Sequence, residues 1–160
     1  MAGTTSLTKI VSGGQTGVDR AALDAAIFLD LEHGGWCPQG RRAEDGTIDP
    51  IYQLRETKES DYAVRTEKNV VDSDATLILC RGRLTGGTLL TERLALKHSR
   101  RLLVIDVGLG AIDESCLMFR DWINSHGIKV LNVAGPREST SPGIGREAEM
   151  FLVKAIGSLK

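Results

Sequence analysis

Aromatic residues are scarce in this chain of 160 residues, where two Trp, two Tyr and three Phe make up 4% of the sequence. The core must therefore be aliphatic, and each exposed aromatic side chain becomes a candidate for ligand contact. Cysteine is also rare: the three residues Cys37, Cys80 and Cys116 include no CxxC pair. An odd count without that spacing argues against a disulfide scaffold and a zinc finger, and it favours a reducing, cytoplasmic compartment.

The chain also lacks an excess of one charge and a long apolar run. Lys and Arg number 20, Asp and Glu number 21, and the net charge is −1. Such a balance provides no electrostatic footprint for duplex nucleic acid or an acidic membrane. No apolar run approaches the roughly 18 residues that span a bilayer, and the N-terminal residues carry no apolar signal region. We therefore expect neither nucleic acid nor a membrane as a partner.

What the sequence does contain is a regular alternation of short apolar runs and helical periodicity. The predicted strands cover residues 9–12, 33–37, 75–80, 102–105 and 129–133. The predicted helices cover residues 18–29, 61–72, 88–98, 112–125 and 144–159. Residues 38–60 are predicted to be mostly loop, with one helical turn at 51–54.

This alternation predicts one α/β domain over residues 1–160, with a mostly parallel sheet and helices on both of its faces. In open sheets of this kind, ligands bind beyond the carboxyl ends of the strands. The segments that follow strands are therefore the first places to look for a site.

The segment after the first predicted strand is rich in glycine. Its candidate ligand contacts are Gly13, Gly14, Gln15, Thr16 and Gly17. Glycine lets the backbone approach a ligand closely, and the first amides of the next helix point at an anion. The spacing fits neither GxGxxG nor GxxxxGK[ST]. We predict an anion or ligand site here, with a tight strand-to-helix turn as the alternative.

A second glycine-rich segment, residues 82–88, follows the most apolar predicted strand and opens a helix. Gly86, Gly87 and Thr88 would place free amides and a hydroxyl at the same edge of the sheet. Two such segments in one short chain support an anion site better than either does by itself.

Two further segments carry candidate contacts. Trp36 could stack on a flat ring or pack in the core, and Arg41 could bind an oxyanion bidentately. Cys37 could ligate a soft metal as a thiolate or fill a small apolar site. Arg137, among glycines and hydroxyls, suits a loop that folds over a ligand or a flexible surface loop. No carboxylate cluster suits a hard metal, and we predict no intrinsic metal site.

Two residues are candidates for electrostatic or acid–base catalysis. Arg65 lies on the polar stripe of the predicted helix 61–72 and matters if that helix borders the ligand crevice. Glu92, one turn into the helix 88–98, is the best-placed carboxylate. The alternative for Arg65 is a solvated helix face, and Glu92 could equally be an ordinary exposed helix residue. The sequence shows no nucleophilic triad.

Seven segments that together span nearly the whole chain in order resemble the putative molybdenum carrier family. They are residues 10–20, 35–41, 43–46, 62–70, 72–76, 86–88 and 132–139. The resemblance implies a Rossmann-like three-layer sandwich and a homo-oligomer. It also implies binding of molybdenum cofactor or a molybdate-like oxyanion. We expect such a ligand, or a related phosphorylated heterocycle, to be bound by the glycine-rich segments, Trp36, Arg41 and Arg137.

The same broader group includes the lysine-decarboxylase-like (LOG) enzymes, which implies an alternative. Those enzymes carry a PGGxGTxEE motif, an upstream Arg, and nucleoside monophosphate phosphoribohydrolase activity. Gly86, Gly87 and Thr88 match part of that motif, and Arg65 lies upstream. The leading Pro and one Gly are absent, and Glu92 lies four residues past Thr88 instead of two or three. A third reading is a nucleotide sensor that binds without turnover.

Overall fold

A five-stranded parallel sheet lies at the centre of the protein, with the strand order β2-β1-β9-β7-β8. The computed structural model describes residues 5–159. The five strands are β1 (Lys9–Val11), β2 (Glu32–Gly34), β7 (Ala75–Cys80), β8 (Arg101–Asp106) and β9 (Val130–Ala134). All six residues of β7 are buried, as its apolar sequence predicts for a strand covered on both faces.

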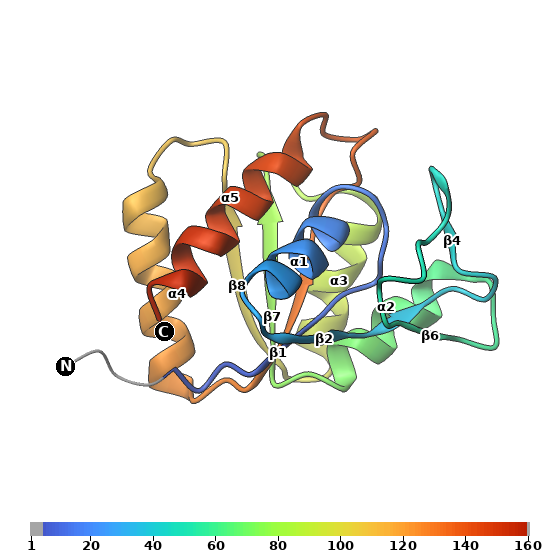
Figure 1. The fold of residues 1–160 in the computed structure, drawn as a ribbon, viewed down its shortest axis with the longest axis horizontal. Coiled ribbons are helices and arrows are strands. Elements are labelled where there is room, and N and C mark those ends of the chain that lie inside the picture. The colour runs from blue at the N-terminus through green and yellow to red at the C-terminus, as the bar shows by residue number, and fades with distance from the viewer. Residues whose placement is uncertain (1–4, 160) are drawn as a thin grey trace.

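Helices cover both faces of this sheet (Figure 1). Three of them share one face: α1 (Val18–Phe28), α4 (Ile112–His126) and α5 (Ile144–Gly157). The other face is covered by α2 (Tyr62–Val71) and α3 (Gly86–Lys97). The predicted α/β, Rossmann-like sandwich is thus confirmed. Within residues 5–159, none of the helices has the length and apolarity needed to cross a membrane.

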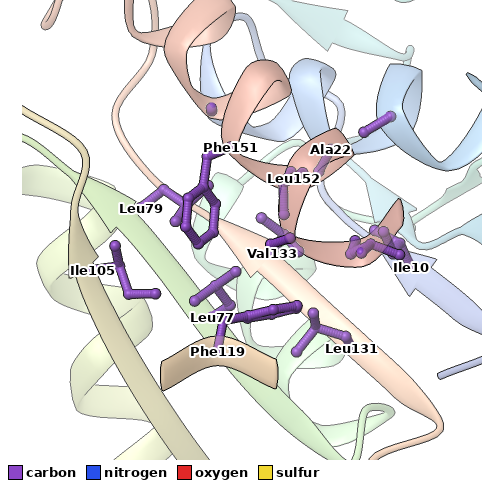
Figure 2. Close-up of a cluster of buried hydrophobic side chains, with 14 of the residues drawn as sticks. Ile10, Ala22, Leu77, Leu79, Ile105, Phe119, Leu131, Val133, Phe151 and Leu152 are labelled. Atoms are coloured by element: carbon purple, nitrogen blue, oxygen red, sulfur yellow. The ribbon is translucent and has the colours of Figure 1, made fainter. Parts of the chain in front are cut away.

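The core is aliphatic, as the scarcity of aromatic residues predicts. Figure 2 shows side chains of the central strands packed against α1, α4 and α5, among them Leu77, Leu131 and Val133. Phe119 and Phe151 are its largest fully buried residues, and their rings meet edge to face with centroids 6.0 Å apart. The alanines of α1 are buried, and their small size lets the helix lie close to α5 and the sheet.

The order of the strands creates a crevice at one end of the sheet. From β1 the chain crosses through α1 to β2, whereas from β7 it crosses through α3, on the opposite face, to β8. Loops that leave β1 and β7 therefore diverge, and β9 lies between these two strands. Such a topological switch point is where ligands bind in open α/β sheets.

The segment between β2 and α2 differs most from its prediction. The strand predicted over 33–37 is interrupted at Gly35, whose φ of 126° turns the chain out of the sheet. Beyond it, β3 (Trp36–Cys37) pairs in parallel with β6 (Arg55–Glu56) in a separate small sheet. The segment predicted as loop also contains a short antiparallel hairpin of β4 (Arg42–Ala43) and β5 (Gly46–Thr47).

Other boundaries shift for local reasons. Residues 51–54 form an irregular turn instead of a helical turn. Helix α3 begins at Gly86, two residues before its predicted start. Two helix ends are capped locally: the Asp61 carboxylate accepts a hydrogen bond from the Ala63 amide at 2.9 Å, and Gly127 ends α4 in the left-handed conformation.

Candidate functional site

A cleft of about 440 Å³ lies at the carboxyl ends of β1, β7 and β9. Four segments meet there, namely the loop after β1, helix α2, the start of α3 and the loop after β9. Residues predicted as contacts and placed on its walls are Gly13, Gln15, Arg65, Gly86, Gly87, Thr88 and Arg137. Further lining residues include Asp19, Tyr62, Asn132, Ser139 and Thr140.

A buried ion pair forms part of the cleft wall. Arg65 donates from Nη1 to Oδ2 of Asp19 at 3.2 Å, and both side chains are 10% exposed. Burial raises the pKa of the Asp19 carboxyl, and the charge of Arg65 opposes that rise. The guanidinium rests on Gly13, where an added Cβ would lie 1.5 Å from Nη1. Gly13 is therefore required because Arg65 occupies the space of a side chain.

The amide of Gln15 is held in one orientation. Its Oε1 accepts hydrogen bonds from the Thr16 amide at 3.1 Å and from the Glu44 amide at 2.9 Å. Rotating the amide would bring its NH₂ group against those two donors, so Nε2 must remain on the other side. Nε2 is buried and has no hydrogen-bond partner within residues 5–159. A buried donor left unpaired costs about 1–3 kcal/mol, which a ligand acceptor would offset.

Arg65 also carries a buried donor that has no hydrogen-bond partner among the described residues. Its Nε, like Nε2 of Gln15, is buried without a partner in the described part of the chain. Two unpaired N–H donors beside one cleft are an unusual concentration, because most buried polar groups in folded proteins are paired.

Most residues of the glycine-rich loop after β1 make contacts that stabilise the fold and do not line the cleft. The Gln15 amide donates to Asp19 Oδ2 at 3.3 Å, and the Val18 amide donates to the Pro136 carbonyl at 3.2 Å. Gly17 has a φ of 79°, and a Cβ there would lie 2.4 Å from that carbonyl. Neither Thr16 nor Gly17 is part of the cleft wall. The same holds for Gly14, which faces Leu54 and Ile48.

The start of α3 presents its backbone to the cleft. Thr85, the residue before the helix, makes no side-chain cap, and nothing lies within 4 Å of where a Cβ would stand on Gly86 or Gly87. The first amides of a helix lack partners within the helix and carry its positive dipole end. This wall therefore suits an anion, with the hydroxyls of Thr85 and Thr88 beside it.

Arg137 supplies the remaining positive charge of the cleft. Its guanidinium carbon lies 5.9 Å from the centroid of the Tyr62 ring, and that of Arg65 lies 5.5 Å from the same centroid. The loop that carries Arg137 is tied down by Arg81, which pairs with Glu147 at 2.8 Å and donates to the Pro142 carbonyl at 2.7 Å. Arg137 thus extends from an anchored loop.

A strap formed by the β4–β5 hairpin joins two of these loops from outside the cleft. The Glu44 carboxylate accepts hydrogen bonds from the hydroxyl of Thr16 and from the amide of Ser139. Its neighbour Asp45 pairs with Arg20 of α1. Hydrogen bonds from Ser139 and Thr16 hold the pKa of Glu44 below its usual value. The strap fixes the relative positions of the loops after β1 and β9.

The structure does not bring Trp36 or Arg41 to the cleft. The Trp36 indole donates to Asp72 at 2.8 Å, and the Lys68 ammonium lies 4.6 Å from its ring centroid. Arg41 donates to four backbone carbonyls, of Ile48, Asp49, Tyr52 and Leu54. This guanidinium organises the irregular segment that follows the hairpin, and so its donors are already in use.

Glu92 also lies outside the cleft lining, one position past Thr91, which does line it. Cys37 is fully buried, and burial raises the pKa of its thiol. Among residues 5–159 no three His, Cys, Asp or Glu side chains gather where they could hold a metal ion.

Among the residues missed from the sequence, three form or support the site through specific contacts. Asp19 follows the glycines and resembles an ordinary acidic residue in the first turn of a helix. Tyr62 was overlooked although it is one of two tyrosines. Glu44 lies in a stretch of loop composition, where nothing in the sequence marks a long-range contact.

Comparison with known proteins places this geometry in a family. A family model described as the circularly permutated YpsA SLOG family matches residues 10–156. The chain belongs to that family. A crystal structure of a putative molybdenum carrier protein from Syntrophus aciditrophicus SB superimposes with a TM-score of 0.92 and 46% sequence identity, over 96% of each chain. The predicted membership of the putative molybdenum carrier family is confirmed. None of the curated proteins matches.

Proposed function

We propose that this member of the YpsA SLOG family binds molybdenum cofactor, or a related phosphorylated heterocycle, and carries it without turnover. The observation that carries the proposal is the concentration of unused donors in one cleft. Buried N–H groups of Gln15 and Arg65 lie at one side, and the uncapped start of α3 lies at another. The description of the homologous crystal structure as a molybdenum carrier protein supports the choice of cargo.

The donors suit each part of such a ligand. A phosphate or oxyanion would accept hydrogen bonds from the Gly86 and Gly87 amides and the Thr88 hydroxyl, and Arg137 would neutralise its charge. The heterocycle would lie near Tyr62, whose ring could contact it over a large apolar area. A cleft of about 440 Å³ is in the range of small-molecule sites.

The geometry favours binding over hydrolysis. In the phosphoribohydrolase alternative Glu92 is the candidate general acid or base, but it does not line the cleft. Asp19, the carboxylate that does line it, is engaged by Arg65.

A thermal-shift panel tests the proposal. Purified protein is heated with molybdate, tungstate, a molybdopterin ligand, AMP, ADP-ribose or NAD. A ligand at about 100 times its Kd stabilises the folded state by about 2.7 kcal/mol, which raises Tm by roughly 5–10 °C for a chain of this size. A shift with the molybdopterin ligand and none with the nucleotides is expected. A shift with AMP or ADP-ribose alone would contradict the proposal and require a turnover assay.

The homo-oligomer remains a prediction. Light scattering coupled to gel filtration, with and without the molybdopterin ligand, measures the mass directly, and a mass of 17.3 kDa under both conditions would refute it.

A further inference from the structure

The charges that line the cleft are unevenly distributed. Within the described part of the chain, three charged residues line it, namely Asp19, Arg65 and Arg137. Asp19 and Arg65 form a buried pair at 3.2 Å and neutralise each other. The Arg137 side chain is 41% exposed and its Nη1 lies 3.9 Å from the nearest Glu44 carboxylate oxygen, so it is only loosely paired. The net positive charge of the cleft therefore resides with Arg137 and the adjoining start of α3.

The two unpaired donors belong to residues that contact a carboxylate. Nε2 of Gln15 and Nε of Arg65 each need an acceptor. The Asp19 carboxylate accepts hydrogen bonds from both residues, from the backbone amide of Gln15 at 3.3 Å and from Arg65 Nη1 at 3.2 Å. An anion that accepted these two unpaired donors would gain little from the charge of Arg65, because Asp19 at 3.2 Å already compensates it.

We infer that the cleft has two chemically distinct subsites: an anion subsite formed by the start of α3 and Arg137, and a neutral-acceptor subsite formed by Gln15 and Arg65. The second subsite takes a carbonyl oxygen or ring nitrogen of an uncharged heterocycle. Asp19 acts there as a specificity determinant, because it compensates the charge of Arg65 and leaves this subsite without the net positive charge that would attract a second phosphate. This inference rests on the proposed function, and it narrows the ligand to one that carries its negative charge at one end and an uncharged ring at the other.

The test uses matched probes: inorganic phosphate, neopterin, and neopterin monophosphate. Binding of each to the full chain is measured by calorimetry, with pterin fluorescence as a second readout. Gln15→Met removes the Nε2 donor without adding charge, and Gln15→Glu keeps acceptors for the Thr16 and Glu44 amides. Gln53→Met makes the same chemical change at an exposed position outside the cleft and serves as the control. Thermal unfolding confirms that each variant is folded.

The two subsites predict opposite patterns. Gln15→Met should lower the affinities for neopterin and neopterin monophosphate by the same factor, about 3- to 10-fold, and leave the affinity for inorganic phosphate unchanged. Arg137→Gln should lower the affinities for inorganic phosphate and neopterin monophosphate by about tenfold or more and leave the affinity for neopterin unchanged. Gln15→Glu should repeat the loss of neopterin binding if Gln15→Met is poorly folded.

Failure of the inference and failure of the proposed function can be distinguished. If the unmodified chain binds neopterin monophosphate, but Gln15→Met weakens inorganic phosphate as much as it weakens neopterin, the anion lies against Gln15 and the assignment of subsites is wrong. If the unmodified chain binds none of the three probes, the proposed function is wrong and the assignment falls with it.

Discussion

Replacing Gly13 by Ala should destabilise the protein and block the cleft through a single collision. The new Cβ would lie 1.5 Å from Arg65 Nη1 and 2.9 Å from Asp19 Oδ2. Because ordinary contact begins at 3.4 Å, the guanidinium must withdraw from a site where both members of the ion pair are 10% exposed. The backbone of Gly13 is not in the left-handed region, so the collision is the main cost.

The magnitude follows from the burial of the pair. Breaking a buried ion pair by displacing one partner costs about 3–5 kcal/mol, since the other charge stays buried and unpaired. For a chain of this size, each kcal/mol lowers Tm by about 2–4 °C, so Gly13→Ala should lower Tm by about 6–20 °C. Calorimetric unfolding at neutral pH measures this shift.

Two comparisons make the test specific. Gly87→Ala is the matched control, because nothing lies within 4 Å of its Cβ position and Ala favours the helix by about 1 kcal/mol or less. Adding Gly13→Ala to Arg65→Ala should cost much less stability than Gly13→Ala costs the unmodified chain, since the main collision partner is gone and only the contact with Asp19 Oδ2 at 2.9 Å remains. A Gly13→Ala protein that melts within about 2 °C of the unmodified chain would refute this account of Gly13.

Three further predictions follow from the surroundings of the cleft. Arg41→Lys should lower the unfolding free energy by about 2–5 kcal/mol, because a lysine cannot reach all four carbonyls. The folded variant should still bind neopterin monophosphate, and calorimetry measures both quantities. Loss of binding in a stable variant would show that Arg41 contacts the ligand. The contribution of Glu44 to stability should be complete above pH 4.5 and should disappear as the pH falls through its lowered pKa. The NMR shift of the Ser139 amide, which donates to Glu44, should follow the same titration. If that titration were unchanged in Glu44→Gln, the assignment to Glu44 would be wrong. A thiol reagent at neutral pH should leave the native protein unmodified and should label Cys37, Cys80 and Cys116 after unfolding. All three thiols are buried, and burial raises their pKa, to about 11 for Cys80. Rapid labelling of the native protein would contradict their burial.

The parts of the fold that the sequence predicts are those with strong local signals. The run Ala75–Cys80 is apolar throughout because both of its faces are covered, so its burial could be predicted without knowledge of its neighbours. Capping by Asp61 and Gly127 is equally local. The order of the strands could not be predicted, because insertion of β9 between β1 and β7 depends on contacts distant in sequence.

The candidate site was predicted in part for the same reason. Glycines at the ends of strands indicate the correct loops, but composition does not reveal which of their amides are already bonded. Thr16, for example, donates to Gln15 and Glu44, and Gly17 packs on the loop after β9. Arg41 appeared to be a ligand contact because the carbonyls that it binds come from an irregular segment with no sequence pattern. Arg65 was recognised only conditionally, since its role depends on where α2 lies.

The most direct test of the central claim is a crystal structure of the protein with neopterin monophosphate bound. The account predicts ligand density in the cleft, with the phosphate at the Gly87 amide and Arg137 and the ring at Gln15. Density beside Trp36 and Arg41, or a phosphate seated against Asp19, would contradict it.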